Sequence, residues 1–158
     1  MKTIKSLLLV MGLSPMLIWA AGSMDGHVSP ASATNAAAGQ PGKPGKVSRT
    51  INVTMNDTMR FEPDSIQVKR GETVRFVVRN VGKVDHEMVI GTAAELKEHA
   101  QMMRSMPDAK HRAPNQITLA PGKLGTLVWQ FDGPGTVDFG CLVPGHFEAG
   151  MVGKVAVK

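Results

Sequence analysis

A succession of short β-type segments from Thr50 to the C-terminus constrains the fold more than any other feature of the chain. The segments are rich in β-branched residues, and several alternate apolar with polar side chains. They read TINVTM, SIQVKR, TVRFVVRN, HEMVI, QITLA, LGTLVWQF, TVDFGC and GKVAVK. Most are separated by turn-forming sequences, at 70–72, 80–83, 120–123 and 132–135. Strands of this length and spacing predict an all-β, Greek-key β-sandwich over residues 50–158.

The segment 73–80, TVRFVVRN, shows the alternation most clearly. Successive side chains of a strand point to opposite faces of its sheet. The pattern therefore predicts that Val74, Phe76 and Val78 share one face of the sheet, with Arg75, Val77 and Arg79 on the other.

One segment, TAAELKEHAQMMRSM at 92–106, departs from the β pattern. Thr92 and Glu95 have the spacing of a capping box, and Pro107 follows as a stop signal. The segment predicts one short helix around 92–106, inserted between two strands. Its expected buried stripe consists of Leu96, Ala100 and Met103.

The N-terminal residues 1–22 have the features of a secretory signal peptide. Lys2 and Lys5 precede an apolar run over 7–18, and small residues follow that run. A retained membrane anchor is the alternative, but the run is short for a bilayer span. We expect export to the periplasm, with no stable membrane insertion after cleavage.

Residues 23–49 are rich in Ala, Gly, Pro and Ser and have no apolar periodicity. This composition predicts a flexible tether ahead of the 50–158 domain. Met24 and His27 in the tether could touch a metal ion transiently, and an inert linker is the alternative.

The charge gives little indication of a polyanionic partner. The formal net charge is +5 at pH 7, and it falls to +3 without the two lysines of the predicted signal peptide. The basic residues are scattered and the chain has no tyrosine. We expect no nucleic-acid binding and a monomeric protein.

Cys141 is the single cysteine of the sequence, within FGCLVPGHFEAGMVGK. An unpaired thiol is a liability in an oxidising compartment, and a bound metal would protect it. His146 and Met151 follow at intervals of five residues. Thiolate, imidazole and thioether donors suit copper and do not suit calcium or magnesium.

A trigonal copper site needs a second imidazole. His86 begins the HEMVI segment after a turn, where a sandwich could bring it against the 141–151 loop. The other histidines lie in the tether, on the helix and after the helix, at His27, His99 and His111. The sequence therefore predicts one copper per chain, with His86, Cys141 and His146 in a plane and Met151 as a weak axial ligand.

Each of these residues also has an ordinary explanation. Cys141 could be a buried structural thiol, His146 a surface residue and Met151 part of the core. Zinc could occupy the same donors, although a structural zinc site normally holds more cysteines or histidines and no methionine. Their combination in one loop of an exported chain with no second cysteine favours copper.

The stretch CLVPGHFEAGMVGKVAV resembles the copper loop of the cupredoxins. Its PGH is similar to azurin and its AGMVGKV is similar to plastocyanin, while residues 61–90 resemble the strands that lead to the family's first histidine ligand. The resemblance spans residues 50–158 and implies the same four ligands.

Two departures from the family pattern concern the surroundings of the metal. The interval from His146 to Met151 is longer than in azurin, and Glu87 stands where an asparagine often fixes the cysteine loop. They favour a green centre over a blue one.

Two functions follow from these expectations. The first is a non-enzymatic electron carrier that cycles copper between Cu(II) and Cu(I) and meets redox partner proteins of the cell envelope. Partners would dock on an apolar patch around His146, with candidates Leu142, Val143, Pro144 and Phe147. The alternative is a copper-tolerance protein that binds or oxidises excess periplasmic copper.

The alternative is motivated by the composition of the predicted helix and the residues after it, where His99, Met102, Met103, Met106 and His111 could bind a second copper. Core filling is the ordinary role of methionines at helical spacing. An oxidase or reductase is not indicated. A trinuclear cluster uses paired His-x-His motifs and a two-copper thiolate centre uses two cysteines, and the sequence has neither.

Overall fold

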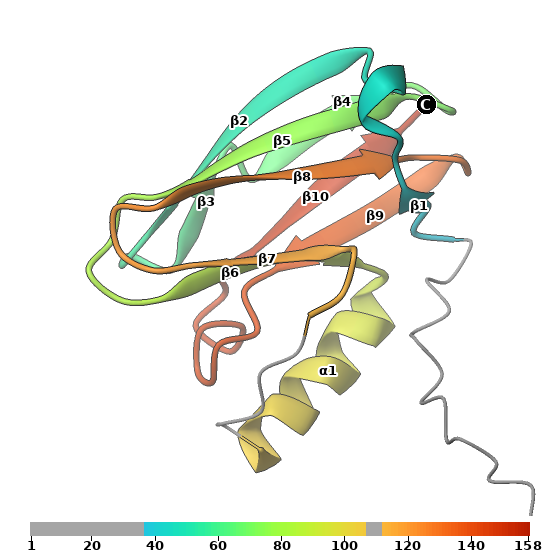
Figure 1. Cartoon of the computed structure of the whole chain (residues 1–158). Helices are drawn as coiled ribbons and strands as arrows, with labels where there is room; N and C mark the ends of the chain where they lie inside the picture. The colour runs from blue at the N-terminus through green and yellow to red at the C-terminus, as the bar shows by residue number, and fades with distance from the viewer. Residues whose placement is uncertain (1–36, 107–111) are drawn as a thin grey trace, which may run out of the picture.

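The computed structural model describes residues 37–106 and 112–158. Two five-stranded sheets pack into a sandwich, and one helix lies outside it (Figure 1). The predicted all-β sandwich with a single helical insertion is confirmed for this part of the chain.

The elements follow one another as β1 (Gln40–Pro41), a 3-10 turn η1 (Pro44–Lys46), β2 (Arg49–Asn56), β3 (Arg60–Glu62), β4 (Ser65–Val68), β5 (Thr73–Asn80), β6 (His86–Gly91), α1 (Ala93–Ser105), β7 (Gln116–Leu119), β8 (Leu124–Gln130), β9 (Gly135–Gly140) and β10 (Val152–Val157). Each of the eight segments read from the sequence overlaps one of these strands. The short strands β1 and β3 were not predicted.

The strand order shows that the chain crosses repeatedly between the two sheets. One sheet has the order β1-β8-β5-β2-β3, and the other has the order β4-β10-β9-β6-β7. The pairs β2–β5 and β4–β10 are parallel, and the remaining pairs are antiparallel. Because β6 and β9 are antiparallel neighbours, the beginning of β6 and the end of β9 lie at the same end of the sandwich.

The core fills the space between the sheets. Val74, Phe76 and Val78 of β5, which the alternation placed on one face, are fully buried there. Phe61 and Phe139 meet edge to face across the sandwich, with ring centroids 5.0 Å apart. Close packing of this kind makes the frame stiff, because side chains in a dense interior have little room to shift.

Residues 38–49 belong to the sandwich, which corrects the prediction of a flexible tether for this part of 23–49. Ala38 is buried in the core and its carbonyl accepts a 2.7 Å hydrogen bond from Nε1 of Trp129. Strand β1 pairs with β8. Backbone hydrogen bonds between strands do not require an apolar pattern, so the composition of residues 38–49 did not indicate the pairing of β1 with β8. Gly39 has a φ of +95°, and a side chain there would clash with the Gln130 carbonyl, so this position requires glycine.

The predicted signal peptide 1–22 and the tether residues 23–36 lie outside the described residues. Across the part of the chain that is described, none of the helices has the length and apolar character needed to cross a bilayer.

Helix α1 begins with the predicted capping box. The Thr92 side chain accepts from the Glu95 N–H, and the Glu95 carboxylate accepts from the Thr92 N–H. Leu96 and Ala100 are buried against Val89 and Leu142, and Met103 packs at the edge of the same cluster. The predicted buried stripe is therefore confirmed. Helix α1 therefore starts where β6 ends and runs back to the 141–151 loop, which it contacts through Leu142 and Glu148 (Figure 1).

Candidate metal centre

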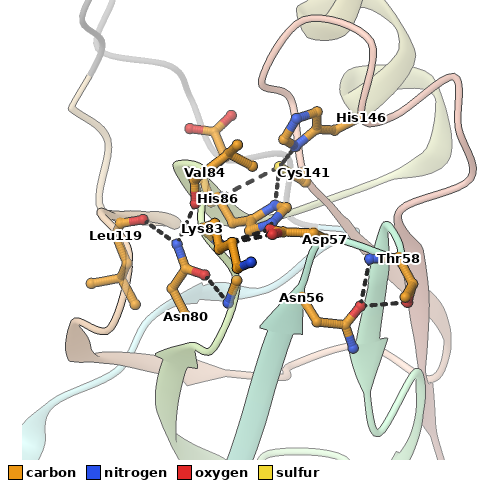
Figure 2. A network of polar contacts seen from close by, with 12 residues as sticks. Asn56, Asp57, Thr58, Asn80, Lys83, Val84, His86, Leu119, Cys141 and His146 are labelled. Atoms are coloured by element: carbon orange, nitrogen blue, oxygen red, sulfur yellow. Dashed lines mark hydrogen bonds and ion pairs between the residues drawn. The ribbon is translucent and has the colours of Figure 1, made fainter.

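Three predicted ligands converge at this end of the sandwich. The donor atoms of His86, Cys141 and His146 all lie within 4.8 Å of one another. The Cys141 sulfur lies 3.3 Å from Nδ1 of His146 and 4.0 Å from Nδ1 of His86, and Figure 2 shows both rings turned toward it. His86 and Cys141 are fully buried, whereas His146 is half-buried.

Strand ends and backbone hydrogen bonds fix these positions. His86 is the first residue of β6, Cys141 follows β9, and Met151 precedes β10. The Cys141 N–H donates to the Met151 carbonyl at 3.0 Å, and the Met151 N–H donates to the His146 carbonyl at 3.0 Å. The 141–151 loop therefore closes on itself and brings the backbone of fully buried Met151 to Cys141.

Side chains from two other elements hold the outside of the 141–151 loop. Arg60 of β3 donates through Nη1 to the carbonyls of Ala149, at 3.2 Å, and Gly150, at 3.3 Å. Arg104 of α1 forms an ion pair with Glu148. The 141–151 loop is thus attached both to β3 and to α1.

The donor set fits a single soft or borderline metal ion. Imidazole nitrogen and thiolate sulfur bind such an ion at about 2.0 and 2.3 Å, so one nitrogen and one sulfur can share it when they lie no more than about 4.3 Å apart. Both sulfur–nitrogen distances satisfy this limit. A buried thiol between two imidazoles, with a buried thioether in the same loop, matches copper chemistry.

Asp57, in the turn between β2 and β3, was not found by sequence reasoning. Its carboxylate lies 3.1 Å from Nε2 of His86 and also accepts the Lys83 N–H at 2.8 Å (Figure 2). These contacts, that of Lys83 first, lower the pKa of Asp57, so the group is ionised at neutral pH. An ionised acceptor at Nε2 favours the tautomer with the proton there, which leaves Nδ1 of His86 free to face Cys141.

Asn80 at the end of β5 shapes the loop that leads to His86. Its Nδ2 donates to the carbonyls of Val84 and Leu119, and its Oδ1 accepts the Gly82 N–H at 2.8 Å. A side chain at Gly82 would clash with the Asp57 carboxylate. No sequence pattern indicated this arrangement, because its partners come together only in the folded chain.

Glu87 occupies the position at which the cupredoxin resemblance leads us to expect an asparagine. Its N–H points to the Cys141 sulfur at 3.4 Å, and its Oε1 accepts the Leu142 N–H at 3.0 Å. Thr118 of β7 donates to the other carboxylate oxygen at 3.1 Å. The carboxylate therefore fixes the start of the 141–151 loop, so the departure from asparagine does not leave the loop unattached.

The protonation of the donors follows from their burial. Burial raises the pKa of the Cys141 thiol to about 12, so the thiol keeps its proton at neutral pH in the metal-free protein. Burial, and then the nearby His86, lowers the pKa of His146, which favours a neutral imidazole. Metal binding at such a site displaces the thiol proton.

Comparison with known proteins agrees with this chemistry. The family model of copper-binding proteins of the plastocyanin/azurin family matches residues 47–158. The chain belongs to the plastocyanin/azurin family. Its cofactor is therefore copper, held at a type 1 site, and the cupredoxin resemblance seen in the sequence is confirmed.

Two relatives carry the same descriptive name. The chain is 57% identical over 120 residues to the copper-resistant cuproprotein CopI of Rubrivivax gelatinosus, covering 76% of this chain and 73% of that protein. It is 40% identical over 119 residues to the protein of that name from Vibrio cholerae, covering 74% and 70%. Among solved structures, auracyanin B superposes with a TM-score of 0.63 at 23% identity, covering 76% of this chain and 96% of that one, which supports the cupredoxin fold.

The cupredoxin's predicted apolar patch around His146 needs one correction. Leu142 is buried beneath α1 and cannot form part of an exposed surface. Val143 and Phe147 are half-buried, and Pro144 is exposed. The inserted helix covers the side of the loop on which Leu142 lies. His99 lies on α1 and does not belong to the cluster of donors, and His27 and His111 are outside the described residues.

Replacing Glu87 tests how this cupredoxin holds its cysteine loop. Glu87→Leu leaves the buried Leu142 N–H without its acceptor, and we expect a loss of about 1–3 kcal/mol in the free energy of unfolding. Glu87→Gln is the matched control, because its amide oxygen still accepts that hydrogen bond. Urea unfolding of the metal-free variants measures the difference. Equal stability of the Leu and Gln variants would show that this contact contributes nothing.

Proposed function

We propose that this cupredoxin is a periplasmic copper-tolerance protein that binds copper through His86, Cys141, His146 and Met151. The observation that carries the proposal is the 57% identity to a protein named a copper-resistant cuproprotein. The ligand assignment is supported by the convergence of the thiol and the two imidazoles at one end of the sandwich.

The residues of the site would act together as a preformed binding frame. Bound copper supplies one-electron chemistry between Cu(II) and Cu(I), and thiolate and thioether donors favour the reduced ion while the imidazoles suit both. Asp57 orients His86, and Glu87 fixes the backbone next to Cys141. Burial of Cys141 keeps water and oxidants from the thiol.

Electron transfer to redox partners of the cell envelope is the second candidate function. It is favoured by the half-buried ring of His146, which is the most exposed of the proposed ligands. A ligand that reaches the surface gives an electron a short path to a docked protein. We favour copper tolerance over electron transfer because both relatives are named copper-resistant cuproproteins.

Deleting the gene in its native host tests the first proposal. We expect the deletion to lower the copper concentration at which growth stops, and the wild-type gene to restore it. A Cys141→Ser gene should fail to restore growth although its protein accumulates. Unchanged copper tolerance of the deletion strain, with a growth defect only under respiratory conditions at low copper, would instead support the electron-carrier function.

A further inference from the structure

Helix α1 exposes two methionines that the core does not use. Met102 has 38% of its surface exposed and Met106 has 47%, while Leu96 and Ala100 of the same helix are buried. Methionine normally fills gaps in a core. That role does not explain these two residues, because their side chains are open to solvent.

The two thioethers lie on the same side of the helix. Met106 follows Met102 by one turn, and the Met106 N–H donates to the Met102 carbonyl at 3.1 Å, so the helical turn extends to Met106. Side chains four residues apart on a helix have Cβ atoms about 5–6 Å apart. Met103, half-buried, borders them, and His99 lies one turn before Met102 and Met103. We call Met102, Met103 and Met106 the methionine face.

Met102 and Met106 are separate from the type 1 centre. Arg104 points toward the 141–151 loop, where it pairs with Glu148. Arg104 is two residues from both Met102 and Met106, which corresponds to about 200° around an α-helix. Met102 and Met106 are therefore on a different side of α1 from Arg104, whereas Met103 borders the cluster that contains Leu142 and Phe147.

We propose that the methionine face binds a second copper ion as Cu(I). Thioether sulfurs are soft, uncharged donors that select Cu(I) over Cu(II), zinc and the hard cations. Two exposed thioethers one turn apart, with a third at their edge, offer the low coordination that Cu(I) accepts. The biological purpose of such a site rests on the proposed copper-tolerance function, whereas the binding itself does not.

Methyl NMR of the full chain tests the site directly. The protein carries one copper at the type 1 centre, is kept reduced, and has ¹³C-labelled methionine methyl groups assigned by Met→Leu variants. Silver(I) is the probe, because it is a soft, diamagnetic ion that mimics Cu(I). We expect saturable shifts of the Met102 and Met106 methyl signals, a smaller shift of Met103, and no shift of Met151.

Two variants complete the test. In Met102→Leu/Met106→Leu the saturable binding of silver(I), and of added Cu(I) in competition with a chelator, should be lost. The matched control Gln101→Leu/Ser105→Leu places leucines at the same spacing on another exposed side of α1 and should bind as the wild type does. Unshifted Met102 and Met106 signals, or unchanged binding by the double methionine variant, would overturn the proposal. If silver(I) shifts the Met102 and Met106 signals as expected but a deletion strain keeps the copper tolerance of the wild type, only the physiological role of the site is rejected.

Discussion

Copper-loaded Cys141→Ser is expected to lose the intense visible absorption of the wild-type protein. That absorption arises from charge transfer between a thiolate sulfur and Cu(II), and serine offers a hard hydroxyl that remains protonated at neutral pH. The buried position between His86 and His146 supplies no other sulfur anion, since the sequence has a single cysteine. Copper affinity should fall as well, because the soft anionic donor is gone.

The substitution is close in size, so the fold should survive it. A serine hydroxyl can still accept the hydrogen bond of the Glu87 N–H, which the Cys141 sulfur accepts in the structure. Circular dichroism of the metal-free variant checks this point. An intense visible band retained by a folded, copper-loaded Cys141→Ser protein would show that another group binds the metal.

Replacing Trp129 with alanine is expected to destabilise the protein by about 3–5 kcal/mol, as removal of a buried aromatic ring does. Trp129 of β8 is fully buried in the core, and its Nε1 donates to the Ala38 carbonyl. The change therefore removes core packing and also the attachment of the first described residues to the sandwich. Urea unfolding of the metal-free protein measures the loss.

Trp129→Phe separates these two contributions. Phenylalanine keeps most of the apolar volume but leaves the Ala38 carbonyl without its donor, an effect of about 1–3 kcal/mol. It should also make the chain around residues 38–42 open to proteolysis before the rest of the domain unfolds. If Trp129→Ala lowered stability by no more than an exposed substitution does, the position of Trp129 in the core would be wrong.

The fold could be predicted where local chemistry decides it. The β-branched segments gave eight strands, and the Thr92–Glu95 capping box gave the helix with its start. Strands β1 and β3 could not be found, because they consist of two and three residues held by pairing with distant strands. The same limit explains why residues 38–49 were taken for a tether.

The metal ligands could be proposed from the sequence because Cys141, His146 and Met151 carry donor atoms that suit copper and follow one another at intervals of five residues. The residues that hold these ligands in place could not be predicted. Asp57 is an ordinary turn residue that lies 29 positions from His86, and Glu87 reaches Leu142 across 55 positions. The pairing of β6 with β9 brings Glu87 close to Leu142, and the packing of the two sheets brings Asp57 close to His86.

The helical insertion changes the surroundings of the site more than its donors. By covering Leu142 and pairing Arg104 with Glu148, α1 closes one side of the 141–151 loop and narrows the surface left around His146. A partner that approaches this cupredoxin would therefore meet Pro144 and the half-buried Val143 and Phe147, beside the helix.

We expect one copper ion to bind between a single thiolate and two imidazoles at the end of the sandwich. X-ray absorption at the copper edge of protein loaded with one equivalent of Cu(II) measures this coordination directly. The expected result is one short copper–sulfur contact together with two imidazole nitrogens. Coordination by nitrogen and oxygen alone, or by two or more short sulfur contacts, would contradict it.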